Sequence, residues 1–145
     1  MDKLDLKTAQ RIIDAAHTYA RETGLQPLGV AVLDARSVLT SYGGQDGTSI
    51  GRAEIAIGKA NGALSMGLGS RTLARRARDV PHFINAVAGT VRGGMVPVPG
   101  GVLIRNERGD LLGAAGISGD TSDNDEAAAL AAIAGAGLVA DPGAD

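Results

Sequence analysis

The apolar positions near the start of the chain recur with the period of an amphipathic helix. They follow one another at alternating steps of three and four residues, so they lie on one face of a helix. These residues are Leu6, Ala9, Ile13, Ala16 and Ala20. We expect this helix to run from about Asp5 to Glu22, because Gly24 is a stop signal and Pro27 lies just beyond it.

Four short apolar segments predict two β-hairpins. Leu28–Leu33 and Val38–Tyr42 are joined by a tight connection that begins at Asp34. Val102–Arg105 and Leu111–Ile117 flank the turn sequence Asn-Glu-Arg-Gly. Because hairpin neighbours run in opposite directions, these segments indicate an antiparallel sheet.

The remaining segments favour helices. A second helix is expected over about 49–68, on a stripe made of Ile50, Ala53, Ile57, Ala60, Leu64 and Leu68. Gly58 and Gly62 within it indicate close packing against another backbone. Short helices follow over 70–79 and 81–88, a last helix over about 122–137, and a flexible tail over 139–145. Hairpins and helices in separate blocks predict a single α+β domain over residues 1–145.

Composition narrows the classes of function. A net charge of −2 gives no reason to expect a nucleic acid partner, and no apolar run reaches the roughly 20 residues that span a membrane. No signal peptide is visible and the chain has no cysteine, so we expect a cytoplasmic protein without thiolate chemistry. With one Phe, two Tyr and no Trp, the core depends on small aliphatic side chains, which favours further burial in a homo-oligomer.

Glycines and carboxylates gather around the turn that follows the fourth predicted strand. Gly113, Gly116 and Gly119 leave that strand nearly bare, as happens where a ligand or another backbone comes close. The free N–H groups of the next helix either bind an anion or are capped locally, and Ser118 lies beside them. We favour capping, because the nearby carboxylates repel an anion: Asp120, Asp123, Asp125 and Glu126.

Few side chains elsewhere offer chemistry. His17 and His82 are the only imidazoles, so each is either a boundary residue or a candidate iron ligand. Lys59 is expected to be solvated, or, if its helix face is covered, to hold a carboxylate or act as a base with a lowered pKa. Glu54 occupies a solvated edge position. A cluster of four arginines that begins at Arg71 is expected to form a solvated helix face.

Three blocks of sequence resemble the haem-degrading-domain or GlcG-like family, which includes the HbpS proteins and the C-terminal domain of PduO. The blocks are Ile55–Ala63, Pro97–Ile104, and Gly113–Gly119 followed by an Asp-Glu pair. The resemblance spans about residues 5–138 and is weak over 69–92. It implies an α+β domain with a central antiparallel sheet of about five strands flanked by helices. It also implies homo-oligomers and, in some members, binding of haem or a related tetrapyrrole.

These observations leave three functional hypotheses. The first is a haem- or tetrapyrrole-binding protein without an intrinsic metal, whose candidate cofactor-binding residues are His17, His82, Pro99, Gly100, Gly116 and Ser118. The second is an enzyme that acts on a small acidic metabolite by proton transfer, with the candidates Lys59, Glu54, Asp120 and Glu126. The third is an assembly module without chemistry, in which the small-residue faces are subunit contacts.

Overall fold

One five-stranded antiparallel sheet organises the computed structural model, which describes residues 1–145, and the α+β prediction is confirmed. The elements are α1 (Leu6–Thr23), β1 (Gly29–Asp34), β2 (Leu39–Gly44), α2 (Arg52–Met66), α3 (Ser70–Asp79), α4 (Pro81–Thr90), β3 (Gly101–Arg105), β4 (Leu111–Ser118), α5 (Ser122–Gly135) and β5 (Val139–Asp141). The strands lie in the order β2-β1-β4-β3-β5, so β2 and β5 form the two edges. Both predicted hairpins are present, as β1–β2 and β3–β4.

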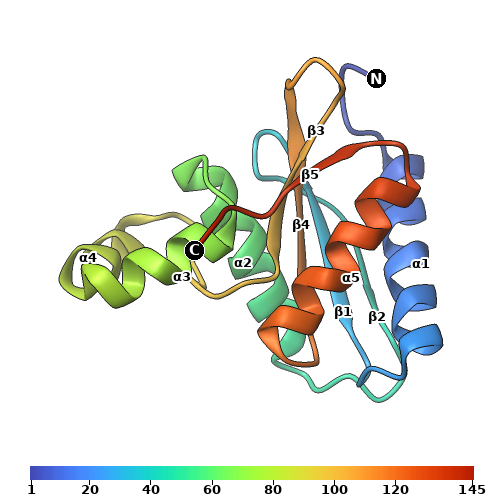
Figure 1. Cartoon of the computed structure of the whole chain (residues 1–145), viewed down its shortest axis with the longest axis horizontal. Coiled ribbons are helices and arrows are strands. Elements are labelled where there is room, and N and C mark those ends of the chain that lie inside the picture. Colours follow the sequence, from blue (N-terminus) through green and yellow to red (C-terminus); the bar gives the residue numbers. More distant parts are fainter.

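Helices cover the two faces of the sheet, α1 and α5 on one side and α2 on the other (Figure 1). The face under α1 and α5 holds the larger core, a cluster of eighteen buried apolar residues. The face under α2 holds seven, mostly alanines. α1 begins where the Asp5 carboxylate accepts a hydrogen bond from Thr8 N at 2.7 Å, and it ends at Gly24 with a φ of 72°. Its predicted face is right except for Leu6, which is exposed.

The predicted apolar stripe of α2 does not describe the face that this helix buries. Ile50 precedes the helix and is fully exposed, and Ile57 is only half-buried. The buried residues are instead Ala56, Gly58, Lys59, Ala60, Asn61, Gly62 and Ala63. The reason is distance, since a Cβ built on Gly116 would overlap the Ala56 carbonyl oxygen. The backbone of α2 approaches the sheet so closely that only small side chains fit between them.

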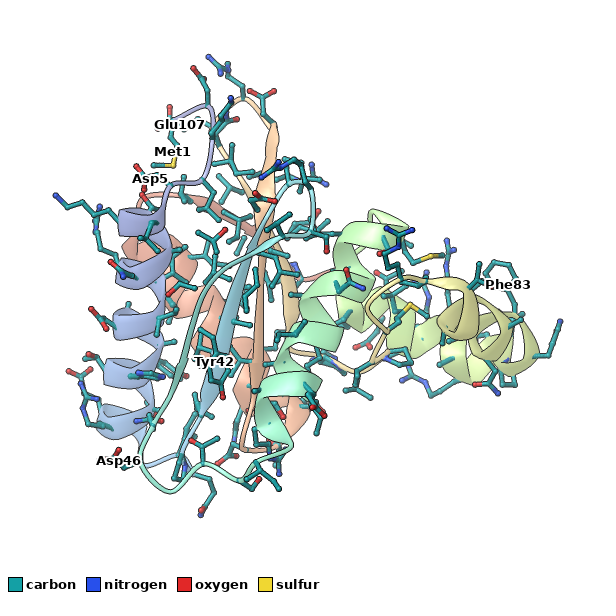
Figure 2. All side chains as sticks on the ribbon, turned by 180° about the vertical axis from the view of Figure 1, so that it is seen from behind. Met1, Asp5, Tyr42, Asp46, Phe83 and Glu107 are labelled. Atoms are coloured by element: carbon teal, nitrogen blue, oxygen red, sulfur yellow. The ribbon has the colours of Figure 1, made fainter.

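α3 and α4 form an arm that projects from the body of the molecule (Figure 1). A small cluster of Leu73, Ile84 and Met95 holds the arm together. Phe83, the chain's only phenylalanine, lies on the outer surface of the arm with 45% of its surface exposed (Figure 2). No helix of the structure combines the length and the hydropathy that crossing a membrane requires.

The last residues form a short strand and contact α3, in the segment that we expected to be a flexible tail. Val139–Asp141 form β5 on the edge of β3, and Arg105 pairs with Asp141 at 3.2 Å. Beyond it, the chain runs along the start of α3, where Arg71 N donates to Pro142 O at 3.2 Å and Thr72 bonds Ala144. A strand of three residues is too short to show an apolar alternation, which is why the pattern does not predict it.

Candidate functional site

A buried ion pair joins α2 to the start of α5. The side chains of Lys59 and Asp125 are only 2% and 1% exposed, and their Nζ and Oδ2 atoms lie 3.1 Å apart. Lys59 Nζ also donates to Ile117 O at 2.8 Å, and Asp125 Oδ1 accepts from Asp120 N at 2.9 Å. Lys59 is therefore not solvated, and the carboxylate that it holds belongs to the protein itself.

The two glycine-rich segments make room for this pair. Gly100 is buried with a φ of 123°, and a Cβ there would lie 2.8 Å from Lys59 Nζ. A Cβ on Gly101 would overlap the Lys59 carbonyl oxygen. Pro99 precedes them in the half-buried stretch before β3. Together with Gly116, these glycines let α2 and its lysine pack directly on β3 and β4, so close backbone packing accounts for them without a ligand.

Burial shifts the pKa values of both members of the pair so that their neutral forms are favoured. Loss of solvation lowers the pKa of Lys59, and the nearby charge of Arg52 lowers it further. The same loss of solvation raises the pKa of Asp125. Because neither side chain reaches solvent, no substrate contacts Lys59 without displacing the residues around it, and the pair acts structurally by fixing α2 to β4 and α5.

The other acid–base candidates are engaged elsewhere or exposed. Glu126 accepts two hydrogen bonds from Arg71 Nε, at 3.1 and 3.0 Å. Asp120 accepts from the side chain of Asn124 and from the backbone N–H groups of Gln26 and Thr121, and these bonds lower its pKa. Glu54 is exposed on α2. The four candidates therefore do not converge on one reacting centre.

The expectation of a solvated face for the arginine cluster is wrong at Arg71. Its guanidinium pairs with Glu126, with Asp123 at 2.5 Å and with Asp145 at 3.2 Å, and these carboxylates raise its pKa. The expected helix cap is formed by Thr121, whose hydroxyl accepts from Asn124 N at 3.2 Å. The acidic residues at the start of α5 therefore form ion pairs with Arg71 and Lys59. These two cations balance much of the negative charge at this end of the helix.

The two histidines lie in unlike surroundings. His17 Nε2 donates to Gly43 O at 3.0 Å, and the ring is half-buried between α1 and β2. A Cβ on Gly43 would lie 2.7 Å from Ile13 and 3.2 Å from the His17 ring, so the glycine makes room for the imidazole. His82 is exposed at the first turn of α4, on the projecting arm. One chain does not bring the two rings to a single iron.

A depression of about 410 Å³ opens beside His17. It is lined by Gln10, Ile13, Asp14, His17, Ser41, Tyr42 and Gly43. No three His, Asp or Glu side chains gather anywhere in the chain to hold a metal ion. His17 is thus the imidazole that this fold places in a hollow.

Comparison with known proteins identifies the family. A family model described as "Haem degrading protein HbpS-like" matches residues 4–134, which is most of the chain. The chain belongs to the HbpS-like family. No curated protein sequence is similar enough to match it.

Solved structures agree with this assignment. HbpS superposes with a TM-score of 0.78 at 26% identity, covering 92% of this chain and 90% of that one. The PduOC:heme complex gives a TM-score of 0.83 at 24% identity and covers 94% and 97% of the two chains. Klebsiella pneumoniae protein ORFY gives 0.83 at 20% identity, with coverage of 94% and 92%. The family resemblance read from the three sequence blocks is confirmed.

The sequence alone does not reveal the roles of Asp125 and Arg52 in the site. Asp125 is expected only to belong to a helix cap, because nothing local links it to a lysine 66 positions earlier. Arg52, whose Nη1 donates to Ser118 Oγ at 3.0 Å, has no motif to mark it. In both cases the signal lies in the tertiary pairing of α2, with the start of α5 for Asp125 and with the end of β4 for Arg52.

Proposed function

We propose that this protein binds haem or a closely related tetrapyrrole, with His17 as the iron ligand. The family description supports the ligand class, and PduOC, which has the same fold, forms a complex with heme. The observation that carries the choice of residue is the hydrogen bond from His17 Nε2 to Gly43 O beside a hollow. No comparable hydrogen-bonded position beside a hollow is found for His82, or for Pro99, Gly100 and Gly116 in the glycine-rich segments.

The chemistry of His17 fits an iron ligand. A neutral imidazole that donates its Nε2 proton to a carbonyl keeps a free lone pair on Nδ1. Histidines that bind metals commonly hold their second N–H in this way, which fixes the orientation and the tautomer of the ring. Bound haem supplies one-electron and oxygen chemistry, and the part of this chain is to present the imidazole and limit access of water.

The walls of the hollow fit haem less completely. Ligand pockets are mostly apolar and enclose most of the ligand surface. Most residues that line the depression beside His17 are polar, and the side chain of Tyr42 packs on the opposite face of the sheet. We therefore propose that a second copy of the chain covers the exposed side of the haem. A core with only one Phe and no Trp gives a further reason for self-association.

Titration with hemin tests this proposal. We expect a saturable shift of the Soret band for the unaltered protein and for His82→Ala, and loss of the shift for His17→Ala. Far-ultraviolet circular dichroism would verify that His17→Ala remains folded, and light scattering with and without hemin would show whether binding requires a dimer or larger oligomer. A Soret shift that His17→Ala leaves unchanged would contradict the assignment of the ligand.

Acid–base catalysis by Lys59 has less support. Its side chain is 2% exposed, and the ammonium is already bonded to Asp125 and Ile117 O. A general base has to come within hydrogen-bond reach of its substrate. The remaining candidates Glu54, Asp120 and Glu126 do not share a site with it.

A further inference from the structure

Three polar side chains, from β2, β4 and α2, lie near the start of β1 on the face of the sheet opposite His17. Arg52 Nη1 donates to Ser118 Oγ at 3.0 Å. Ser118 is completely buried, and its hydroxyl oxygen accepts this bond. The Tyr42 hydroxyl is half-buried and forms no hydrogen bond. We call Arg52, Ser118 and Tyr42 the Arg52 cluster.

Gly29 brings the members of the cluster together. A Cβ built on Gly29 would lie 2.6 Å from the Tyr42 hydroxyl oxygen and 3.4 Å from Arg52 Cβ. The missing side chain therefore lets the phenol of the edge strand lie across β1 toward the first residue of α2. Gly29 also pairs with Ser118 in the sheet, which places the serine on the same side.

The cluster has positive charge that no acidic side chain offsets. Arg52 takes part in none of the ion pairs of the chain. The buried carboxylate of Asp125 is already paired with Lys59, whose pKa the charge of Arg52 lowers. A cation at the first residue of a helix also opposes the helix dipole. The protein thus keeps an arginine half-buried where its own structure supplies no counter-ion.

We infer that the Arg52 cluster binds a small oxyanion, a carboxylate or a phosphate. A guanidinium presents five N–H donors in a planar fork that matches either group, and only one of them is bound to Ser118. The half-buried Tyr42 hydroxyl donates to the same oxygens, and Ser118, which is completely buried, holds the guanidinium in position. Both groups that face the ligand are donors, so a cation or a neutral acceptor-poor ligand is disfavoured.

Titration of the ¹⁵N-labelled protein with inorganic phosphate and, separately, with malonate tests the inference. We expect saturable shifts of the backbone amide signals of Gly29, Arg52 and Ser118 with at least one of the two anions. The anion that binds more tightly shows whether the cluster prefers a phosphate or a carboxylate. Arg52→Gln should weaken binding about 10- to 100-fold, since a hydrogen bond to a charged group is lost. Tyr42→Phe, which removes only a hydroxyl from a half-buried side chain, should weaken it about 2- to 10-fold.

Arg36→Gln is the matched control, because Arg36 is 80% exposed and its loss changes the net charge by the same amount. An equal weakening by Arg36→Gln would attribute binding to overall charge and overturn the inference. Absence of saturable shifts with both anions would overturn it as well. The test is independent of the haem proposal: His17→Ala should keep anion binding, and Arg52→Gln should keep the Soret shift of hemin.

Discussion

The buried pair of Lys59 and Asp125 gives the most direct prediction about stability. Lys59→Met keeps the aliphatic stem and removes the ammonium, which leaves a carboxylate that is 1% exposed without its cation. Breaking a buried pair on one side costs about 3–5 kcal/mol. The Ile117 carbonyl loses its side-chain donor in the same variant. Asp125→Asn leaves Lys59 without its anion and should cost a similar free energy.

The double variant Lys59→Met/Asp125→Asn should cost less than the sum of the two single changes. It removes both charges, so no uncompensated ion stays in the interior, and the amide oxygen that replaces the Asp125 carboxylate can still accept from Asp120 N. What remains is the lost donor to Ile117 O, worth about 1–3 kcal/mol. Two single changes of about 3–5 kcal/mol and a double change near 3 kcal/mol imply a coupling of at least about 3 kcal/mol.

Urea denaturation of the four proteins, followed by circular dichroism at pH 7, measures this cycle. The midpoints give the free energies of unfolding, provided that the slopes of the transitions agree. A coupling below about 0.5 kcal/mol would show that the two charges do not depend on one another and would refute the reasoning. Lys59→Met without a loss of stability would mean that the carboxylate is solvated, against the burial in the structure.

Three further predictions concern packing and charge. Gly116→Ala should destabilise the protein by several kcal/mol because its Cβ would overlap a carbonyl oxygen of α2, whereas Gly89→Ala, with open space around it in α4, should raise the melting temperature slightly. Asp120→Asn should lower stability at neutral pH, and the difference should vanish as the pH falls below 3.8 through the lower pKa of the folded carboxyl. Arg71→Gln should speed amide hydrogen exchange over residues 143–145, since the Asp145 carboxylate loses its ion pair with the Arg71 guanidinium at the start of α3.

The sequence predicts the elements well because local signals mark their ends. Asp5 and Gly24 bound α1 through a cap and a left-handed residue, as expected from residue type. The buried face of α2 is predicted wrongly, because the rule that large apolar residues point inward fails where backbones are in contact. Its buried residues are alanines, glycines, one asparagine and one lysine. The partner of that lysine lies in α5, and no local pattern contains the pairing.

The glycine-rich segments that identify the family therefore say little about where a ligand lies. The space beside Gly100, Gly101 and Gly116 is filled by the backbone of α2 and by Lys59, so no ligand fits beside these three glycines. The open positions lie instead along β2, an edge strand with alternating side chains. Gly43 faces α1 and makes room for His17, and the preceding residue, Tyr42, faces the opposite side. One edge strand thus carries both proposed sites, and substitutions on each of its faces should affect one ligand and spare the other.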